Sequence, residues 1–531
     1  MKKDFLKYIL MAGIVMLTSC MSNDKFLEEK LYGKLFPESF YSNKAEMELA
    51  NNALYKGLSD AFHSYYVTFM RMLYSGDDIT SPISKVDTYI YSAADEDLTY
   101  GWRRAYETIN RANGIIENYH RAEGTLDGKE LLYYAGQAHF VRAYMYFWLV
   151  RIFNEVPYVT TVRVSDRTRE LTPVPEIYEY IIEDLKLAEQ WLPRTWDGID
   201  QVKHNGAALT EGAAKATLAS VYLTMAGYPA LGGNLGVTEC YRLAKEKAAE
   251  IINNEADYGY RLIAHCADLW KPRPILNDEM VFALVYDGVS CYNVSGPAYC
   301  RPMDLGGWGG LCAEINFFIR FPAGERKEAT FIHEFPFKNG NLTLPWPENE
   351  PMTSWEEMNW NPFINKYWEV VGSEGPTKWE KNFPDEWRSD RTNQMIRYAE
   401  VLLIYAEAQA MADGSPNDQA YDCINRVRNR AYAGVGSTGK ELQRGLSATA
   451  FRDSVFVERG WEFAGFEYAS RWFDLVRFEL VEDAIQQYPV NSFLPGRNAK
   501  DGTYIRPPSK PESYFHPRPE EEVLLNPNLA N

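Results

Sequence analysis

The side chains that could do chemistry in this chain are carboxylates and aromatic rings rather than nucleophiles or metal ligands. Its seven histidines are scattered without the HExxH spacing of a metalloprotease, and no GxSxG nucleophile turn is present. We also expect no phosphate-binding glycine loop. The best carboxylate pair, Glu400 and Glu407, shares one face of an expected helix at about 10 Å along its axis. That separation is near the wide limit for an inverting glycosidase.

Salt bridges explain these two carboxylates better than catalysis does, because two helical segments in series would naturally pair in this way. The expected partners are Arg397 on the same helix and Arg426, Arg428 or Arg430 on the next one. The sequence therefore predicts no catalytic residues, and a protein that is not an enzyme.

Aromatic residues make up 14% of the chain, and this excess favours carbohydrate binding. Six tryptophans lie between Trp346 and Trp387, among prolines that rule out a long helix there. Pyranose rings stack their C–H faces on Trp and Tyr, while their hydroxyls bond to Asn, Asp and Arg. Loops on a rigid scaffold are the expected place for such a site. The stretches 65–91 and 286–360 both fit, although packing is the competing explanation for any single aromatic residue.

The N-terminus has the pattern of a bacterial lipoprotein signal. Three lysines precede an apolar run at residues 8–17, which is too short to span a bilayer and has the length of a secretory signal. Small residues then lead to Cys20, the cysteine of a lipobox. We predict cleavage of residues 1–19 and lipidation of Cys20, with an ordinary signal peptide as the alternative.

Composition limits the partners of the remaining chain. The formal net charge of the whole sequence is −18, and removing residues 1–19 makes it more acidic still. Nucleic acids and anionic head groups bind clustered Lys and Arg, so both are excluded. We expect the acyl chains alone to hold the protein at a membrane.

The other cysteines have no CxxC or Cys/His ligand spacing, so we expect neither a metal site nor a cofactor. An exported protein could pair some of them, but buried or free thiols explain most of them better. They are Cys240, Cys266, Cys291, Cys300, Cys312 and Cys423.

Hydrophobic periodicity predicts successive amphipathic helices from 46 to about 252. Gly136, Phe140, Ala143, Phe147 and Val150 recur at helical spacing on one face. Pro193 ends a second helix, and small residues in 211–226 would let a neighbouring helix approach closely.

The pattern changes after residue 283. The stretch 284–395 is rich in Gly and Pro and is expected to form loops with short strands. Helices are expected to resume at 396–412, 418–432 and 451–478, before a Pro-rich tail from 487 that would wrap the surface.

Nine groups of short segments follow one another along the chain in a recognisable order. They lie at 102–113, 136–144 with 153–157, 181–185 with 192–193, 212–216 with 221–223, 396–401, 425–431, 458–459, 471–477, and 517–519 with 526–529. In this order the chain resembles the SusD/RagB family of outer-membrane nutrient-binding lipoproteins of Bacteroidetes.

The resemblance implies a mainly α fold of about eight helices in four tetratricopeptide-like pairs, with a loop-rich, short-strand second half packed on them. It divides the chain into a signal peptide (1–19), an N-terminal helical region (20–283), an aromatic insert (284–395) and a C-terminal helical region with its tail (396–531).

The resemblance also implies a function and a site. The protein would be a surface-exposed, glycan-binding lid on a TonB-dependent SusC-like barrel, for polysaccharide or oligosaccharide uptake at the outer membrane. A peptide-binding lid and a purely structural barrel partner remain alternatives. Family ligands lie in a groove between loops of the two aromatic stretches, so the candidate ligand residues are Tyr74, Asp77, Asp78, Tyr89, Tyr292, Arg301, Trp308, Trp346 and Trp360. Asp77 and Asp78 follow Gly76 and could bind calcium or sugar hydroxyls, although a solvated turn is the simpler explanation.

Overall fold

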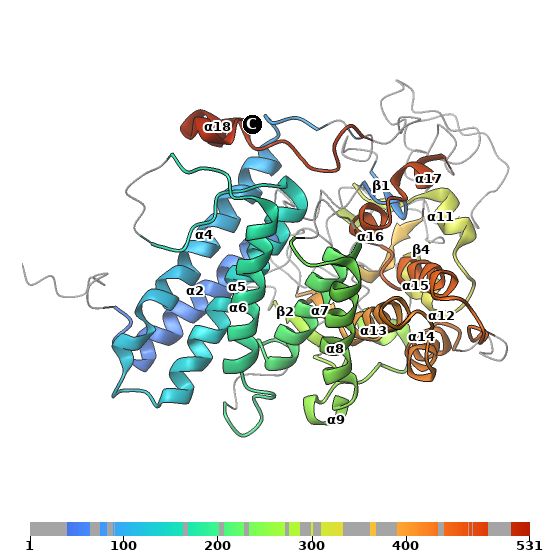
Figure 1. The fold of residues 1–531 in the computed structure, drawn as a ribbon, viewed down its shortest axis with the longest axis horizontal. Helices are drawn as coiled ribbons and strands as arrows, with labels where there is room; N and C mark the ends of the chain where they lie inside the picture. Colours follow the sequence, from blue (N-terminus) through green and yellow to red (C-terminus); the bar gives the residue numbers. More distant parts are fainter. Residues whose placement is uncertain are drawn as a thin grey trace, which may run out of the picture.

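The computed structural model describes most of the helical parts of the chain and several pieces of the rest. The described residues are 40–63, 75–81, 89, 91–162, 168–200, 206–227, 233–270, 276–286, 299–300, 310–332, 362–367, 390–433, 440–465, 467–469, 471–486 and 511–530. Figure 1 shows long helices side by side in one half and shorter elements gathered in the other.

The scaffold is a row of helices in which each packs on the next. The row runs through α2 (Lys44–His63), α4 (Glu96–Asn118), α5 (Gly128–Phe153), α6 (Val174–Trp191), α7 (Glu211–Gly227), α8 (Val237–Ile252), α13 (Tyr398–Asp413) and α14 (Asp418–Ala431). The chain leaves the row after α8 and returns to it at α13, which packs directly against α8 (Figure 1). The predicted mainly α fold of paired helices is confirmed.

Helix α5 is the centre of this half. Its start is fixed by Asp127, whose carboxylate accepts hydrogen bonds from the backbone N–H groups of Lys129 and Glu130 at 2.8 Å each. The sequence predicts one apolar face, but nearly every side chain from Tyr134 onward is buried. The helix is covered on several sides because α4 and α6 flank it and Phe282 of a later strand packs on Phe140.

The second half contains two small sheets. Strand β2 (Met280–Leu284) pairs antiparallel with β6 (Asn393–Arg397), so the two ends of the predicted insert meet. A second sheet has the order β1-β3-β5-β4, from β1 (Ile79–Thr80), β3 (Cys312–Ala313), β5 (Phe363–Ile364) and β4 (Phe331–Ile332).

Short helices and turns complete the described fold. They are η3 (Tyr119–Ala122), α9 (Glu255–Tyr258), η5 (Cys266–Trp270), α11 (Ile315–Arg320), α12 (Glu325–Thr330), η8 (Asn365–Tyr367), α15 (Ala448–Glu462), α16 (Arg471–Arg477), α17 (Val481–Gln486), α18 (Glu520–Leu525) and η9 (Pro527–Leu529). The helices α11 and α12 lie where the sequence predicts only loops and strands.

Two predicted helix boundaries are wrong. The helix expected from 396 begins at Tyr398, because Ile396 and Arg397 belong to β6. The helix expected over 451–478 is two helices, α15 and α16. Gly465, between them, has φ +82°, and a Cβ there would lie 3.2 Å from Ile364. This left-handed residue breaks the helix so that the chain can pass over the short sheet.

The described part of the tail, 511–530, lies across the ends of α4 and α5 (Figure 1). The His516 N–H donates to the carbonyl of Ile152 at 2.8 Å, and the Glu520 N–H donates to the carbonyl of Ala93 at 2.8 Å. Within the described ranges, no helix has the length and hydrophobicity needed to cross a bilayer.

Candidate functional site

Strand pairing brings the two predicted ligand-binding stretches together. Ile79 pairs with Ala313, and Thr80 pairs with Cys312, across β1 and β3. On one side of this pair the Ser81 hydroxyl donates to the carbonyl of Gly310 at 2.6 Å; on the other the Glu314 N–H donates to the carbonyl of Asp78 at 3.0 Å. The stretches 65–91 and 286–360 therefore meet at this sheet.

The turn that carries Asp77 and Asp78 is not solvated, which corrects the simpler of the two sequence interpretations. Each residue is only 4% exposed. The Arg471 guanidinium donates to both carboxylate oxygens of Asp77, at 2.6 and 3.1 Å, and the Gly465 N–H donates to Asp78 Oδ2 at 3.0 Å. Burial, together with the neighbouring charge of Asp77, raises the pKa of Asp78 to about 6. Asp77 and Asp78 together attach the turn to Arg471 of α16 and to Gly465, which precedes that helix.

An open cavity lies on one side of this turn, where the predicted residue Tyr89 is found. Tyr89 and Tyr91 form one wall, Phe153 and Asn154 form the next, and tail residues between Pro511 and Arg518 close it. Its volume is about 510 Å³, within the usual range for small-ligand sites. We call it the tail cavity.

The aromatic walls of the tail cavity are held in place by their neighbours. The Tyr89 hydroxyl donates to the carbonyl of Ser75 at 3.3 Å, and the Ser75 and Tyr91 hydroxyls are hydrogen-bonded at 3.2 Å. The Tyr91 ring lies 4.1 Å from the ring of His516, centroid to centroid. These contacts fix the rings before any ligand arrives.

Two described residues other than glycine that have a positive φ line the same cavity. Tyr89 has φ +58°, and Asn154, at the end of α5, has φ +65° and ψ −121°. Left-handed conformations of residues other than glycine cost free energy and persist where the surrounding structure enforces them. Because two of these residues line one cavity, its shape is imposed by the fold around it.

The chemistry of the tail cavity suits a neutral, polyhydroxylated ligand. His516 is buried, and burial lowers the pKa of its imidazole to about 3, so the ring is uncharged at neutral pH. Glu512 and Arg518 bring one negative and one positive charge to the lining. Aromatic rings with amide and hydroxyl groups nearby can stack a sugar ring and bond to its hydroxyls.

The remaining predicted ligand residues lie outside the described ranges, as does the predicted lipid anchor Cys20. They are Tyr74, Tyr292, Arg301, Trp308, Trp346 and Trp360. Their roles stay predictions. Sequence reasoning missed the part played by the tail residues 511–518, because no local pattern links them to Tyr89, more than 400 residues earlier.

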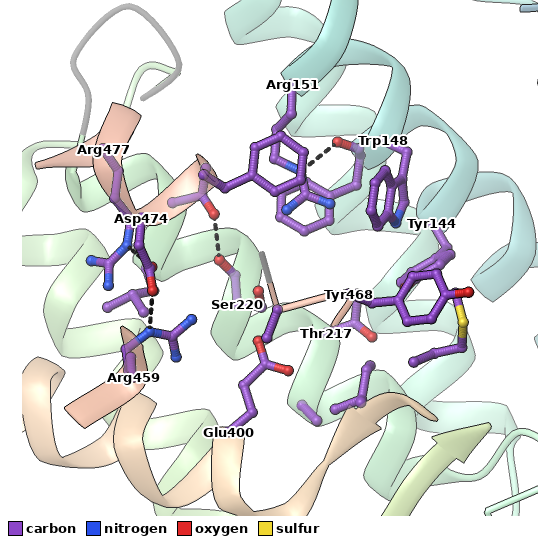
Figure 2. A pocket seen from close by; sticks show the side chains of 18 residues that line it. Tyr144, Trp148, Arg151, Thr217, Ser220, Glu400, Arg459, Tyr468, Asp474 and Arg477 are labelled. Atoms are coloured by element: carbon purple, nitrogen blue, oxygen red, sulfur yellow. Dashed lines mark hydrogen bonds and ion pairs between the residues drawn. The ribbon is translucent and has the colours of Figure 1, made fainter. Parts of the chain in front are cut away.

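The carboxylates Glu400 and Glu407 do not form a glycosidase site. Glu407 is fully buried and accepts two hydrogen bonds from Arg477, one of them at 2.8 Å. Figure 2 shows the Glu400 side chain in a small enclosed space between Arg459 and Tyr468. This space measures about 40 Å³, enough for a few water molecules but not for a sugar ring. Burial raises the pKa of Glu400 to about 6.

The predicted partners of these carboxylates are wrong. Arg397 lies at the end of β6, before the helix begins, and donates to Glu279 at 2.7 Å, Glu462 at 2.7 Å and Glu467 at 2.8 Å. The other three arginines also bind different carboxylates: Arg426 pairs with Glu255, Arg428 with Glu458, and Arg430 with Glu279 and Glu462.

Arg397 and Arg430 belong to a buried ionic network that joins the insert to the C-terminal helices. Arg326 of α12 donates to Glu458 at 2.6 Å and to Glu462 at 3.0 Å, and Lys366 of η8 pairs with Glu467. The network consists of the cations Arg326, Lys366, Arg397 and Arg430 and the anions Glu279, Glu458, Glu462 and Glu467. The partly exposed Arg428 also donates to Glu458, at 2.8 Å, and this dense pairing of opposite charges favours a structural role.

Against expectation, the chain contains a glycine-rich run that resembles a phosphate-binding loop. Residues 434–440 read GVGSTGK, but Glu441 follows where such a loop needs Ser or Thr for its magnesium ion. The run also follows helix α14, whereas a phosphate-binding loop follows a strand. In both respects the run departs from a phosphate-binding loop. Among the residues that the structure describes, no cluster of His, Cys, Asp and Glu has the arrangement of a metal site.

The cysteines of the described ranges are buried. Cys240, Cys266 and Cys423 carry free thiols, and burial raises the pKa of Cys240 and Cys266 to about 11. Cys300 and Cys312 are buried in the second half, and Cys291 lies outside the described ranges.

Comparison with known proteins places this geometry in a family. Residues 297–531 match the model of the SusD family, and residues 25–223 match a model described as "Starch-binding associating with outer membrane". The chain is 29% identical to a SusD-like protein of Formosa agariphila, with 98% of each chain aligned.

Solved structures share the fold. A SusD homologue from Bacteroides thetaiotaomicron superposes with a TM-score of 0.77 at 21% identity, covering 93% of this chain and 97% of that one. A laminarin-binding SusD-like protein gives a TM-score of 0.68 at 19% identity, covering 92% and 98%. Two family models match successive parts of the chain, a relative aligns with it along its whole length, and solved structures share its fold. The chain therefore belongs to the SusD/RagB family.

Proposed function

We propose that this protein is a glycan-binding lipoprotein that serves as a lid on a TonB-dependent SusC-like barrel in the outer membrane. The observation that carries the proposal is the tail cavity, in which rings held by hydrogen bonds and ring contacts line a space of about 510 Å³. A laminarin-binding SusD-like protein with the same fold supports a carbohydrate ligand.

The tail cavity favours binding without chemical conversion of the ligand. The imidazole of His516 is buried with its pKa far below neutral, so it is a poor general base at neutral pH. The tyrosine hydroxyls are engaged with Ser75. Stacking on the rings would therefore supply affinity, and the polar groups would orient the sugar.

The anchor and the partner complete the proposal. Lipidation at Cys20 would tether an acidic body that has little electrostatic attraction to anionic head groups. A ligand held between lid and barrel can favour the closed assembly only if it contacts that state better than the open one. Metabolic labelling with a palmitate analogue, with Cys20→Ala as the control, tests the anchor, and co-purification with the barrel tests the partner.

Affinity electrophoresis tests the ligand class. The full-length protein would be run through native gels that contain laminarin, xyloglucan or amylopectin, with a mixed-peptide competitor in parallel. We expect retardation by at least one polysaccharide and a loss of about fivefold in Tyr91→Ala, since stacking of a ring contributes about 1 kcal/mol.

A matched control separates this loss from a general effect of removing a tyrosine. Tyr180 on α6 is also partly exposed and stacks on Tyr158 at 3.9 Å, and it does not line the tail cavity. Tyr180→Ala should migrate like the wild type in every gel. If the peptide mixture abolished the retardation of the protein in the gels and no added sugar did, the peptide-uptake alternative would be favoured instead.

A further inference from the structure

A second open cavity lies beside the turn that carries Asp77. It is bounded by α11, α15, α16 and α17, which Figure 1 shows gathered near β1. Its volume is about 430 Å³, again within the range of small-molecule sites. Asp77 contributes to its lining, whereas Tyr89 and Tyr91 do not. We call it the α15–α17 cavity.

One wall of the α15–α17 cavity is aromatic and rigid. The Trp461 ring lies 4.8 Å from Phe317 and 5.0 Å from Phe321, centroid to centroid, in tilted and edge-on contacts. Both phenylalanines are buried, while Trp461 remains partly exposed and lines the cavity. An indole fixed in this way offers a preformed surface for the C–H face of a sugar ring.

The polar part of the lining is also preorganised. Arg471 is held by both carboxylate oxygens of Asp77, and its guanidinium lies 4.0 Å from the centre of the Phe456 ring. It rests against α15 at Gly460, where a Cβ would lie 2.9 Å from Arg471 Nη1. Glycine inside a helix costs about 1 kcal/mol relative to alanine, and the room for this guanidinium explains its presence.

The charges of the lining select the class of ligand. Arg320 and Arg471 are balanced by Asp77 and Asp483. A uronic acid or a sulfated sugar would have to approach two carboxylates, which removes the advantage of the arginines. A neutral sugar has hydroxyls that both donate and accept, so it can use cations and anions alike.

We propose that the α15–α17 cavity is a second site for a neutral saccharide unit, with Trp461 as its stacking surface. This inference rests on the proposed function, that the chain binds a neutral glycan. Asp77 lines this cavity, and Ser75, two residues before it, is hydrogen-bonded to Tyr89 and Tyr91 of the tail cavity. One polysaccharide chain can therefore be held at both sites, and the second contact is then intramolecular. Long polysaccharides therefore bind more tightly than short oligosaccharides.

The test blocks the mouth of the cavity without touching its core. Val457 lines the cavity and is 46% exposed, so Val457→Trp places a bulky ring at the entrance on a solvent-facing helical position. Val237, 49% exposed on α8, provides the matched control Val237→Trp. In gels containing laminarin, xyloglucan or amylopectin, we expect Val457→Trp to lose about tenfold in affinity for the polysaccharide that retards the wild type. Val237→Trp should lose nothing.

A spectroscopic readout shows whether the saccharide reaches Trp461. In protein labelled with 5-fluorotryptophan, the ¹⁹F resonance of Trp461 is assigned as the one missing from Trp461→Phe. That resonance should shift when the corresponding oligosaccharide is added, and it should still shift in Tyr91→Ala, in which the tail cavity is impaired.

The outcomes distinguish this inference from the function on which it rests. A wild type retarded by none of the three polysaccharides contradicts the proposed function and the second site with it. Wild-type retardation that Val457→Trp leaves unchanged, with a Trp461 resonance that does not move, overturns the second site alone. Equal losses in Val457→Trp and Val237→Trp would also overturn it, because the effect would then not belong to the cavity.

Discussion

Glu462 holds the centre of the buried ionic network, and its neutralisation should be among the most damaging conservative changes in the protein. One carboxylate oxygen accepts from Arg397 at 2.7 Å and from Arg430 at 2.5 Å, and the other accepts from Arg326 at 3.0 Å. The residue is 2% exposed. Burial opposes its ionisation, but the charges of the three arginines outweigh burial and hold the pKa of Glu462 well below its usual range.

Glu462→Gln keeps the shape of the side chain and removes one negative charge. The guanidinium groups around it then carry an uncompensated charge, and the amide N–H₂ must face at least one of them. Removing one partner of a buried ion pair costs about 3–5 kcal/mol. Because whole domains are stable by only about 5–15 kcal/mol, this variant should lose about a fifth or more of its stability.

The assay is urea unfolding followed by tryptophan fluorescence at neutral pH. The control is Glu521→Gln, since Glu521 pairs with Arg103 on the surface, where both side chains are largely exposed. Its stability should stay within about 0.5 kcal/mol of the wild type. A second variant, Glu462→Gln with Arg326→Met, removes a matched pair of charges and should be less damaged than the sum of its single changes. A loss below about 1 kcal/mol in Glu462→Gln would refute the reasoning.

Three further predictions concern other parts of the fold. The pKa of Asp78 is raised in the folded state, so its contribution to stability is full below about pH 4 and is lost as the pH rises toward 6. In urea unfolding, Asp78→Asn should therefore be as stable as the wild type at pH 4 and more stable by up to about 3 kcal/mol at pH 8. Gly227→Ala would place a Cβ 2.6 Å from the Arg477 Cβ and should lower stability by about 1–3 kcal/mol in thermal melts. Gly128→Ala is the control: its Cβ would have open space around it, so this variant should be neutral or slightly stabilising in the same assay. The pKa of His516 is lowered to about 3 in the folded state, so its contribution to stability is full above pH 6.5 and is lost as the pH falls. The wild type should lose about 2 kcal/mol of stability through this residue between pH 6.5 and 5, and His516→Gln should not show that loss. An unchanged pH profile of stability in the variant would contradict this.

The helical scaffold could be predicted from local signals. Apolar periodicity and helix-ending residues place α6, α7 and α14 within a few residues of their observed bounds, because these patterns need only neighbours in sequence. The break between α15 and α16 was missed, because the close approach of Gly465 to Ile364 depends on a contact across about a hundred residues.

The candidate site was predictable only in part. Composition draws attention to the two aromatic stretches, the family resemblance implies that they meet, and the β1–β3 pairing brings them together. The burial of Asp77 was not predictable, because its counter-charge, Arg471, lies almost four hundred residues further on. The true partners of Arg397 were missed for the same reason, because Glu279 lies 118 residues before it and is not among the carboxylates close to it in sequence.

The pairing of β2 with β6 makes the helical scaffold tolerant of changes in the length of the insert. Leu284 and Asn393 face each other across the two strands, so the chain departs from the row of helices and rejoins it at one place. Doubling the length of a flexible connection between two such fixed points costs only about 0.6 kcal/mol. Among the described residues, the intervening chain is tied to β1 through β3, and Arg326 and Lys366 tie it to α15 and to the segment that follows α15. Segments exchanged with those of a relative between these ties and the two strands would therefore leave the helical framework unchanged.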